Sequence, residues 1–218
     1  MSENVVDWYE RAKQEFEKME FSDKLKLIRS TALFHYHPNF IKFNGYVQVK
    51  DDFEISAGDD DFYVYLWKHI DGEIFYVGSG KDERYRDKCN RPMEFLKHID
   101  KGDAVVYRIL CGVDMKTARF YERYVSGSLS LANFSLANRD NNVFYIGESK
   151  FKRWLNDNKH ALENEITHKI EDVILNKVLL DHDFQGHHFY AIQTFMKECG
   201  ETYFSSGAFR TYPPTEVV

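Results

Sequence analysis

Two short runs of sequence decide the fold: Phe62-Tyr63-Val64-Tyr65-Leu66-Trp67 and, after six further residues, Ile74-Phe75-Tyr76-Val77-Gly78. Aromatic and β-branched residues fill both runs, which is typical of β-strands. Asp71-Gly72 lies between them and favours the tight turn of a β-hairpin. Residues 62–78 are therefore predicted to form an antiparallel hairpin.

The residues after the hairpin predict a helix, a third strand and a second helix. Residues 83–99 favour a helix that is interrupted near Pro92, and residues 104–110 form an apolar, β-branched run. Asp114 can cap a helix whose apolar residues recur at three- and four-residue steps. This order predicts an α+β fold with a small three-stranded antiparallel sheet and flanking helices.

The two flanks of this segment have helical patterns. Apolar residues recur at helical spacing in the first 35 residues, and residues 149–180 are largely helical in pattern. The acidic, turn-like stretch 58–61 is the candidate boundary on the N-terminal side. We therefore predict a helical extension over residues 1–60, a core over residues 61–142 and a mainly helical extension over residues 143–218.

Composition places the chain among globular proteins without a membrane span. Of the 218 residues, 43% are hydrophobic and 29% are charged, which excludes a disordered chain. No uncharged apolar stretch approaches 18 residues, and the first residues lack the pattern of a signal peptide. The three cysteines are far apart and form no metal-binding pair, so a reducing, cytoplasmic location is expected.

The charge distribution directs attention to the middle of the chain. The net charge of −6 is weak support for nucleic-acid binding, for which a basic patch is expected. Residues 61–142 nevertheless carry a net charge of +1. They contain a cluster of basic side chains: Lys81, Arg84, Arg86, Lys88 and Arg91.

The hairpin also carries a motif. Tyr63-Val64-Tyr65, ten intervening residues and Tyr76-Val77-Gly78 resemble the signature of the GIY-YIG nucleases. An arginine in residues 81–86, Glu122 and Asn138 follow in the order of that family. The resemblance covers residues 61–142, about a third of the chain.

The resemblance implies a role for each of these residues. Tyr65 would be the base or its relay, with Tyr76 as its partner, because positive charge near a phenol favours the phenolate. Arg84 would bind the phosphate, and Glu122 would hold Mg²⁺ or Mn²⁺, which completes its shell with water and substrate phosphate. Asn138 would order the site.

Three positions depart from the family pattern or leave an alternative open. Tyr63 stands where the motif has its first glycine, and Lys88 stands where many members carry a histidine. Arg86 is the alternative to Arg84 as the phosphate-binding arginine. The remaining basic residues of the cluster are expected to contact DNA: Lys81, Arg86, Lys88 and Arg91.

These observations predict a metal-dependent endonuclease that hydrolyses DNA, of the restriction or homing type. Double-stranded DNA is the expected partner, and the flanks would add target recognition or dimerisation, so a homodimer is possible. Two alternatives belong to other classes. One is a binding module that keeps the fold without turnover, and the other is an interaction protein whose N-terminal helices bind another protein. Taken singly, each tyrosine is also compatible with ordinary cross-strand packing.

Overall fold

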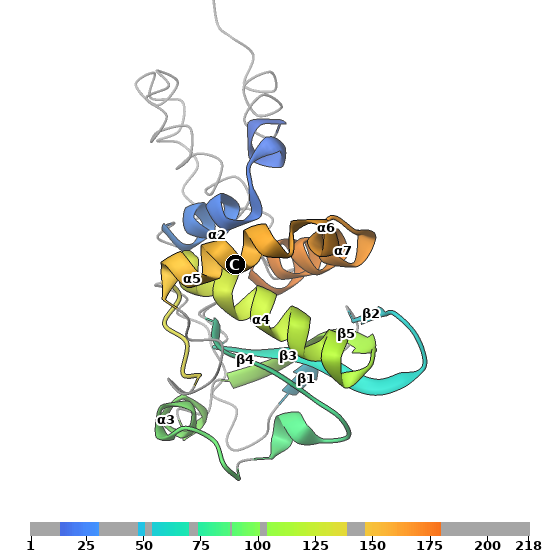
Figure 1. Ribbon diagram of the computed structural model, residues 1–218. Coiled ribbons are helices and arrows are strands. Elements are labelled where there is room, and N and C mark those ends of the chain that lie inside the picture. Colours follow the sequence, from blue (N-terminus) through green and yellow to red (C-terminus); the bar gives the residue numbers. More distant parts are fainter. Residues whose placement is uncertain are drawn as a thin grey trace, which may run out of the picture.

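A computed structural model describes residues 14–30, 48–50, 54–69, 74–87, 89–100, 104–138 and 147–179. Figure 1 shows an α+β arrangement in which helices lie on both sides of one sheet. Part of each predicted extension, the turn at residues 70–73 and the loop after Asn138 lie outside the described residues.

The predicted hairpin is confirmed. Strands β3 (Asp60–His69) and β4 (Ile74–Gly80) pair antiparallel, and β5 (Ala104–Gly112) pairs antiparallel with the other edge of β3. These three strands contain the three predicted runs. β4 lies at the edge of the sheet, whose order is β1-β5-β3-β4.

The sheet contains parallel as well as antiparallel strands, whereas we predicted a sheet of three antiparallel strands only. β1 (Gln48–Lys50) and β2 (Ile55–Ser56) both run parallel to β5. Strands of three and two residues are too short to show an alternating pattern, so the sequence gives no signal for them. The segment that we predicted to be a helical extension thus also supplies strands to the central sheet.

The segment between β4 and β5 forms two separate helical pieces, as the position of Pro92 predicts. A single 3₁₀ turn, η2 (Arg84–Arg86), comes first, and helix α3 (Met93–Asp100) follows. Asn90 between them has a positive φ of 59°, a left-handed conformation that reverses the chain. This reversal returns Arg91 toward the sheet.

Helix α4 (Met115–Leu131) begins as predicted, because the Asp114 side chain accepts hydrogen bonds from the backbone N–H groups of Lys116 and Thr117. α5 (Glu148–Asp157), α6 (Lys159–Leu162) and α7 (Glu165–Val173) follow, and α7 continues as the π-helix η3 (Ile174–Leu179). The helical character predicted for residues 149–180 is confirmed over the described part. Within the described residues, no helix is long and apolar enough to span a membrane.

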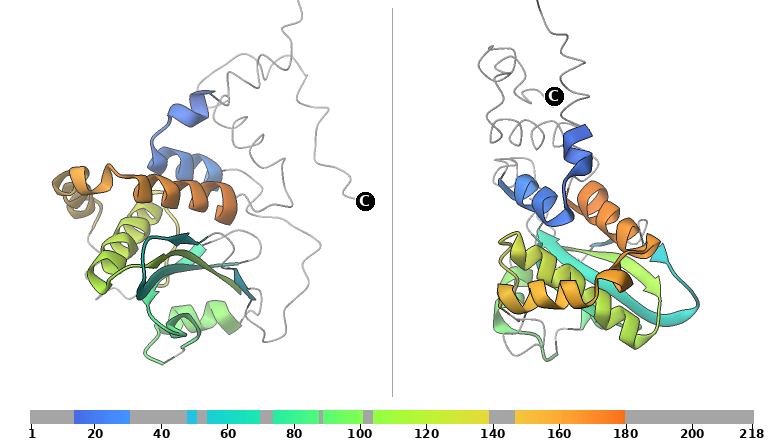
Figure 2. Two further views of the ribbon diagram at one scale, coloured as in Figure 1. Left: turned by 90° about the vertical axis from the view of Figure 1, so that its right-hand side faces the viewer. Right: turned by 45° about the horizontal axis from the view of Figure 1, so that its top comes forward.

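The two faces of the sheet bury different side chains because successive residues of a strand point to opposite faces. Val64 and Leu66 face the larger apolar cluster, which includes residues of α2 (Phe21–Ser30), α4, α7 and η3. Tyr63, Tyr65 and Trp67 face the second cluster, which includes Phe95 of α3. The views in Figure 2 show the same layers, with α3 on one side of the sheet and α4 with the remaining helices on the other.

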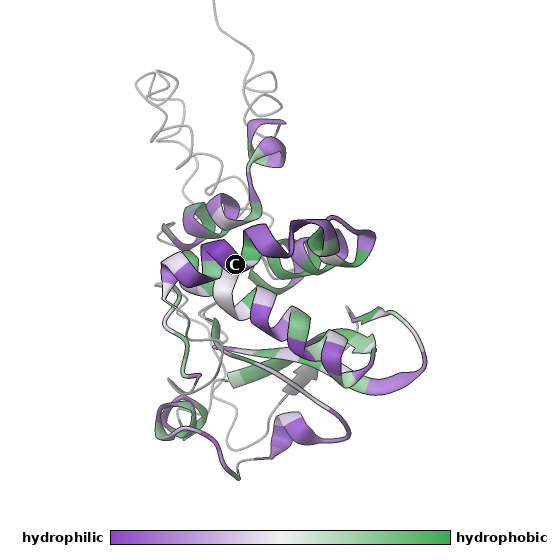
Figure 3. Ribbon diagram, viewed as in Figure 1, coloured by the Kyte–Doolittle hydropathy of each residue, from purple (hydrophilic) through white to green (hydrophobic). Residues whose placement is uncertain are grey.

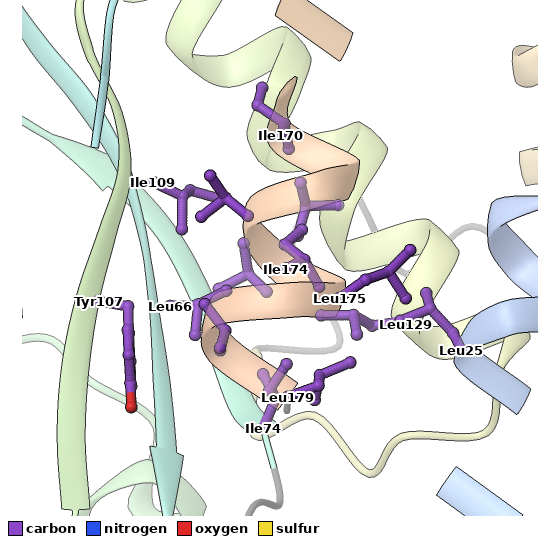
Figure 4. Packing of buried hydrophobic residues seen from close by; sticks show 14 of the residues in the cluster. Leu25, Leu66, Ile74, Tyr107, Ile109, Leu129, Ile170, Ile174, Leu175 and Leu179 are labelled. Carbon is purple, nitrogen blue, oxygen red and sulfur yellow. The ribbon is translucent and has the colours of Figure 1, made fainter. Parts of the chain in front are cut away.

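The larger cluster joins the C-terminal helices to the sheet. Figure 4 shows Ile170, Ile174 and Leu179 close to Leu66 and Ile109 of the strands. In Figure 3 the hydrophobic colour follows the strands and the inner faces of the helices, whereas the η2 turn is hydrophilic. The helical layer is therefore part of the same apolar core as the sheet.

Candidate nuclease site

Tyr65 and Tyr76 lie on one face of the hairpin and are diagonal neighbours. Tyr65 is opposite Gly78, and Tyr76 is opposite Trp67. The two phenol rings are 6.4 Å apart between centroids. A Cβ atom on residue 78 would lie 2.6 Å from the Tyr65 hydroxyl, so a glycine is required there for the phenol to cross β4.

Arg91 joins the two phenols. Its Nη1 donates to the Tyr76 hydroxyl and its Nη2 to the Tyr65 hydroxyl, each at 2.8 Å. The same guanidinium donates from Nε to the carbonyl oxygen of Asp87 (2.8 Å) and from Nη2 to that of Arg84 (2.6 Å). From the sequence we expected Arg91 to lie on the DNA-contacting surface. The structure instead places it, 6% exposed, between the two tyrosines.

The environment of Tyr65 favours its neutral form. Burial raises the pKa of the Tyr65 hydroxyl well above its usual value of 10, although the positive charge of Arg91 opposes this rise. Tyr65 therefore keeps its proton at neutral pH, with Arg91 donating to its oxygen. Ionisation of Tyr65 would require additional positive charge close to the phenol.

Glu122 approaches the tyrosines from helix α4. Its Oε2 accepts a hydrogen bond from the Ser79 hydroxyl at 2.5 Å, which ties the helix to the edge strand β4. The carboxylate is buried, and this burial raises its pKa, while Ser79 and the charge of Arg119 lower it.

A cavity of about 680 Å³, here called the phenol pocket, contains these groups together. Side chains of β3, β4, the segment after β4, α4 and α5 line it, among them Tyr65, Tyr76, Arg84, Arg91, Glu122 and Trp154. A larger cavity of about 1000 Å³ lies between α2, α4 and α7. It contains none of the predicted site residues, so the phenol pocket is the candidate site.

The two arginines of the η2 turn differ in position. Arg84 lines the phenol pocket and forms an ion pair with Asp87. Arg86 pairs with Glu83 at 3.3 Å and is not among the described lining residues of the pocket. Lys81 is exposed beside this turn, and the side chain of Lys88 lies outside the described residues.

Asn138 supports the strand that carries Tyr76. Its Nδ2 donates to the carbonyl oxygen of Val77 at 2.8 Å, and its Oδ1 accepts from the N–H of Val77 at 3.2 Å. The amide thus acts as a hydrogen-bonding partner for the outer edge of β4. Asn138 therefore supports the strand next to Tyr76 and is not among the described lining residues of the phenol pocket.

Tyr63, which stands at the motif's glycine position, anchors the η2 turn. Its hydroxyl donates to the carbonyl oxygen of Asp82 at 2.9 Å and accepts from the N–H of Tyr85 at 3.3 Å. The two rings also meet edge to face, with centroids 6.0 Å apart. Tyr63, which is larger than the glycine of the motif, therefore holds in place the turn that carries Arg84.

The lining of the pocket includes further residues that the sequence did not mark as site residues, among them basic and aromatic side chains of two helices. Arg119, Phe120 and Arg123 come from α4, and Trp154 comes from α5. The helical spacing of Arg119 and Arg123, four residues apart on one face, was an available signal. Nothing in the sequence indicates that Trp154 lies beside them, because this contact depends on how α5 packs on α4.

Glu122 is the candidate metal ligand. In the described part of the chain, no group of three or more His, Cys, Asp or Glu side chains could hold a metal ion. Mg²⁺ commonly binds through one or two carboxylates and fills its remaining positions with water and substrate phosphate. Among the described lining residues, Glu122 is the one carboxylate that could serve as such a ligand, with the Ser79 hydroxyl beside it.

Comparisons of the chain with family models, curated proteins and solved structures found no match.

Proposed function

We propose that the chain is a metal-dependent endonuclease that hydrolyses DNA phosphodiester bonds with a GIY-YIG type of core. The observation that carries the proposal is the meeting of Tyr65, Tyr76, Arg91 and Glu122 in one pocket. These residues come from two strands, a turn and a helix that are distant in the sequence. The element order strand, strand, helix, strand, helix after residue 60 also agrees with that core.

In this proposal Arg91 and Arg84 have different roles. A guanidinium has five N–H groups, and Arg91 already uses four of them within the protein. Arg91 therefore holds the phenols in place, and the more exposed Arg84 binds the scissile phosphate. Arg84 must leave Asp87 or share its charge with it when the phosphate arrives.

The phenols handle the proton in this scheme. With Arg91 donating to both phenolic oxygens, each hydroxyl hydrogen is free to donate to phosphate or water. Tyr65 or Tyr76 can accept a proton from the attacking water only when positive charge favours the phenolate. Glu122 would hold a divalent cation, which would supply that charge and would stabilise the negative charge that develops on the phosphate.

A catalytically inactive DNA-binding module is the second candidate. It is favoured by the burial that raises the pKa of Tyr65, because a phenol that stays neutral can donate a hydrogen bond to phosphate but is a poor base. It would use the same arginines for phosphate and would not need Glu122.

The test is a plasmid-cutting assay with Glu122→Gln and a matched control. Supercoiled plasmid and a mixture of genomic DNAs are incubated with the protein in Mg²⁺, in Mn²⁺ and in EDTA. Wild-type protein should cut only with metal, and Glu122→Gln should cut at least about 100-fold more slowly. Glu165→Gln, on the exposed side of α7, should cut as wild type does.

Gel shifts in EDTA separate the two candidates. DNA binding without cutting by wild-type protein would support the binding module. Equal cutting by wild type and Glu122→Gln would remove Glu122 from the mechanism. A large fall in melting temperature for Glu122→Gln would mark it as a structural residue instead.

A further inference from the structure

The α4–α5 side of the phenol pocket is aromatic and basic. The rings of Phe120 and Trp154 are 5.2 Å apart between centroids, and the Arg123 guanidinium lies 5.2 Å from the centre of the Trp154 ring. Phe151 stacks on Trp154 with an interplanar angle of 14°. Phe151, Trp154 and Arg123 therefore form a stacked group whose arginine borders the pocket.

The reactive groups lie deep in the pocket. Tyr65 is 1% exposed and Tyr76 is 8% exposed, whereas Met115, which also lines the pocket, is 47% exposed. In an intact duplex the phosphates lie on the outside of the double helix, which is too wide to enter a pocket of this size. Contact with the phenols therefore requires that the nucleotide itself enter the pocket.

The size and charge of the pocket suit one nucleotide. A volume of about 680 Å³ is in the range of pockets that enclose small ligands. The described lining residues include four arginines and a single carboxylate, Glu122. The Nε of Arg123 is buried and has no hydrogen-bond partner among the described residues.

We propose that the phenol pocket binds one unstacked nucleotide of the DNA. The base lies on the stacked group of Arg123 and Trp154, and the phosphate lies toward Arg84 and the phenols. Bases stack on arginine planes as well as on aromatic rings, and this replaces the stacking that the base loses when it leaves the helix. The inference rests on the proposed function for its choice of DNA. It predicts that strands with unpaired nucleotides are preferred over intact duplex.

The test measures binding in EDTA, separately from cutting. Fluorescence anisotropy gives the dissociation constant for a fluorescein-labelled 12-nucleotide single strand and for the same sequence as a blunt duplex. Wild-type protein should bind the single strand more tightly. Arg123→Gln should weaken single-strand binding at least about fivefold, the scale of losing one stacked base, and change duplex binding much less.

Arg153→Gln is the matched control because it removes the same charge from the exposed side of α5. It should weaken binding of both probes by one similar, small factor. Trp154→Leu, with its melting temperature measured, should repeat the selective loss of single-strand binding. Equal effects of Arg123→Gln and Arg153→Gln, or equal wild-type affinity for the two probes, would overturn the inference.

A plasmid-cutting assay on the same preparations separates this inference from the proposed function. Cutting by wild-type protein without a single-strand preference would overturn the nucleotide pocket and leave the nuclease intact. Single-strand preference that depends on Arg123, without cutting in Mg²⁺ or Mn²⁺, would support the nucleotide pocket and refute the nuclease.

Discussion

Arg91 shows how one side chain can hold several groups of the candidate site in place. Its guanidinium connects both phenols to two backbone carbonyl groups of the preceding turn. The planar fork matches this pattern of acceptors, and a lysine has only one nitrogen with which to reach them. The position of the phenols therefore depends on the geometry of arginine as well as on its charge.

We predict that Arg91→Lys lowers the rate of plasmid cutting by about 10- to 100-fold. The single nitrogen of lysine cannot donate to both phenolic hydroxyl groups, and each charge-assisted hydrogen bond is worth about 1.5–3 kcal/mol. DNA affinity in EDTA should change little, since the positive charge remains. The control is Arg86→Lys, which should cut normally. A wild-type cutting rate for Arg91→Lys would show that cutting does not depend on a guanidinium that donates to both phenols.

Arg84 and Arg86 provide the second test at this scale. Arg84→Ala should slow cutting by roughly 30- to 1000-fold if its charge stabilises the transition state, the effect of about 2–4 kcal/mol. Arg86→Ala should have a small effect, because Arg86 pairs with Glu83 away from the pocket. Both rates are measured by the same plasmid time course. Equal losses, or a larger loss for Arg86→Ala, would contradict the assignment of Arg84.

The resemblance to a known motif, together with the predicted hairpin and helix, pointed from the sequence to Tyr65, Tyr76 and Glu122. Tyr65, Tyr76 and Glu122 lie in one pocket because a hairpin and a capped helix bring them there, and both elements have clear local signals. Arg91 could not be placed in this way. Its position depends on the left-handed turn at Asn90 and on the packing of α3, which are tertiary effects.

At the scale of elements, the contact between α4 and α5 depends on Gly127. A Cβ atom on this residue would lie 2.1 Å from the Phe151 ring, so the two helices meet at a distance that only glycine permits. Alanine is the better helix former, by about 1 kcal/mol relative to glycine. The steric conflict and the gain in helix propensity therefore act in opposite directions.

We expect the steric conflict to dominate. Gly127→Ala should lower the free energy of unfolding by about 1–3 kcal/mol, the cost of overpacking a filled core. Urea denaturation measures this change. Gly147→Ala is the control, since no atom lies within 4 Å of the added methyl group. A Gly127→Ala protein as stable as wild type would show that α5 can move away from α4 freely.

The cap of α4 predicts a pH dependence of stability. The N–H of Thr117 is the main cause that lowers the pKa of Asp114. Folding lowers the pKa of this carboxyl group, so the group stabilises the folded protein at pH values above about 3.9, its pKa in the unfolded chain. This stabilisation is lost as the pH falls through the pKa that the group has in the folded protein. Thermal melts between pH 7 and pH 2.5 test this.

Asp114→Asn keeps a good cap that does not titrate. Its melting temperature should fall less than that of wild type below pH 4, so the two curves converge or cross on the acid side. Asp114→Ala should be less stable than wild type at neutral pH. Parallel curves for wild type and Asp114→Asn over the whole range would contradict the capping explanation.

Sequence patterns predicted the long elements well and the short ones poorly. The runs at residues 62–67, 74–78 and 104–110 are the centres of β3, β4 and β5 because each buries an apolar face. β1 and β2 form by pairing with the edge of β5 that β3 leaves open, and their partner residues lie 57 and 55 positions later in the chain. Such pairing is a property of the sheet rather than of either short segment.

At the scale of the whole molecule, the core is shared by segments from both flanks. Leu25 and Ile28 of α2, with Ile170 and Ile174 of the C-terminal helices, belong to the apolar cluster that covers the sheet. Their removal would expose the α4 face to water.

We therefore predict that a fragment of residues 61–142 is less stable and less soluble than the full chain. Each fully buried Leu or Ile side chain contributes about 1.5–3 kcal/mol, so the loss of several together is comparable to the whole stability of an ordinary domain. Urea denaturation and sedimentation of the two proteins measure the difference. A monomeric, soluble fragment with the stability of the full chain would show that the flanks are separate modules.

The parallel pairing of β1 and β2 with β5 has a consequence for synthesis. Gly112 follows Ser56 by 56 residues, and ribosomes add about 5–20 residues per second. The N-terminal strands are thus made about 3–11 s before their partner strand is complete. β4 is complete only at Gly80, so for the last 32 residues of this interval the aromatic β3–β4 hairpin has been made and β5 has not. We therefore expect a pause in translation before residue 104 to leave this hairpin without its β5 partner and to lower the yield of folded protein.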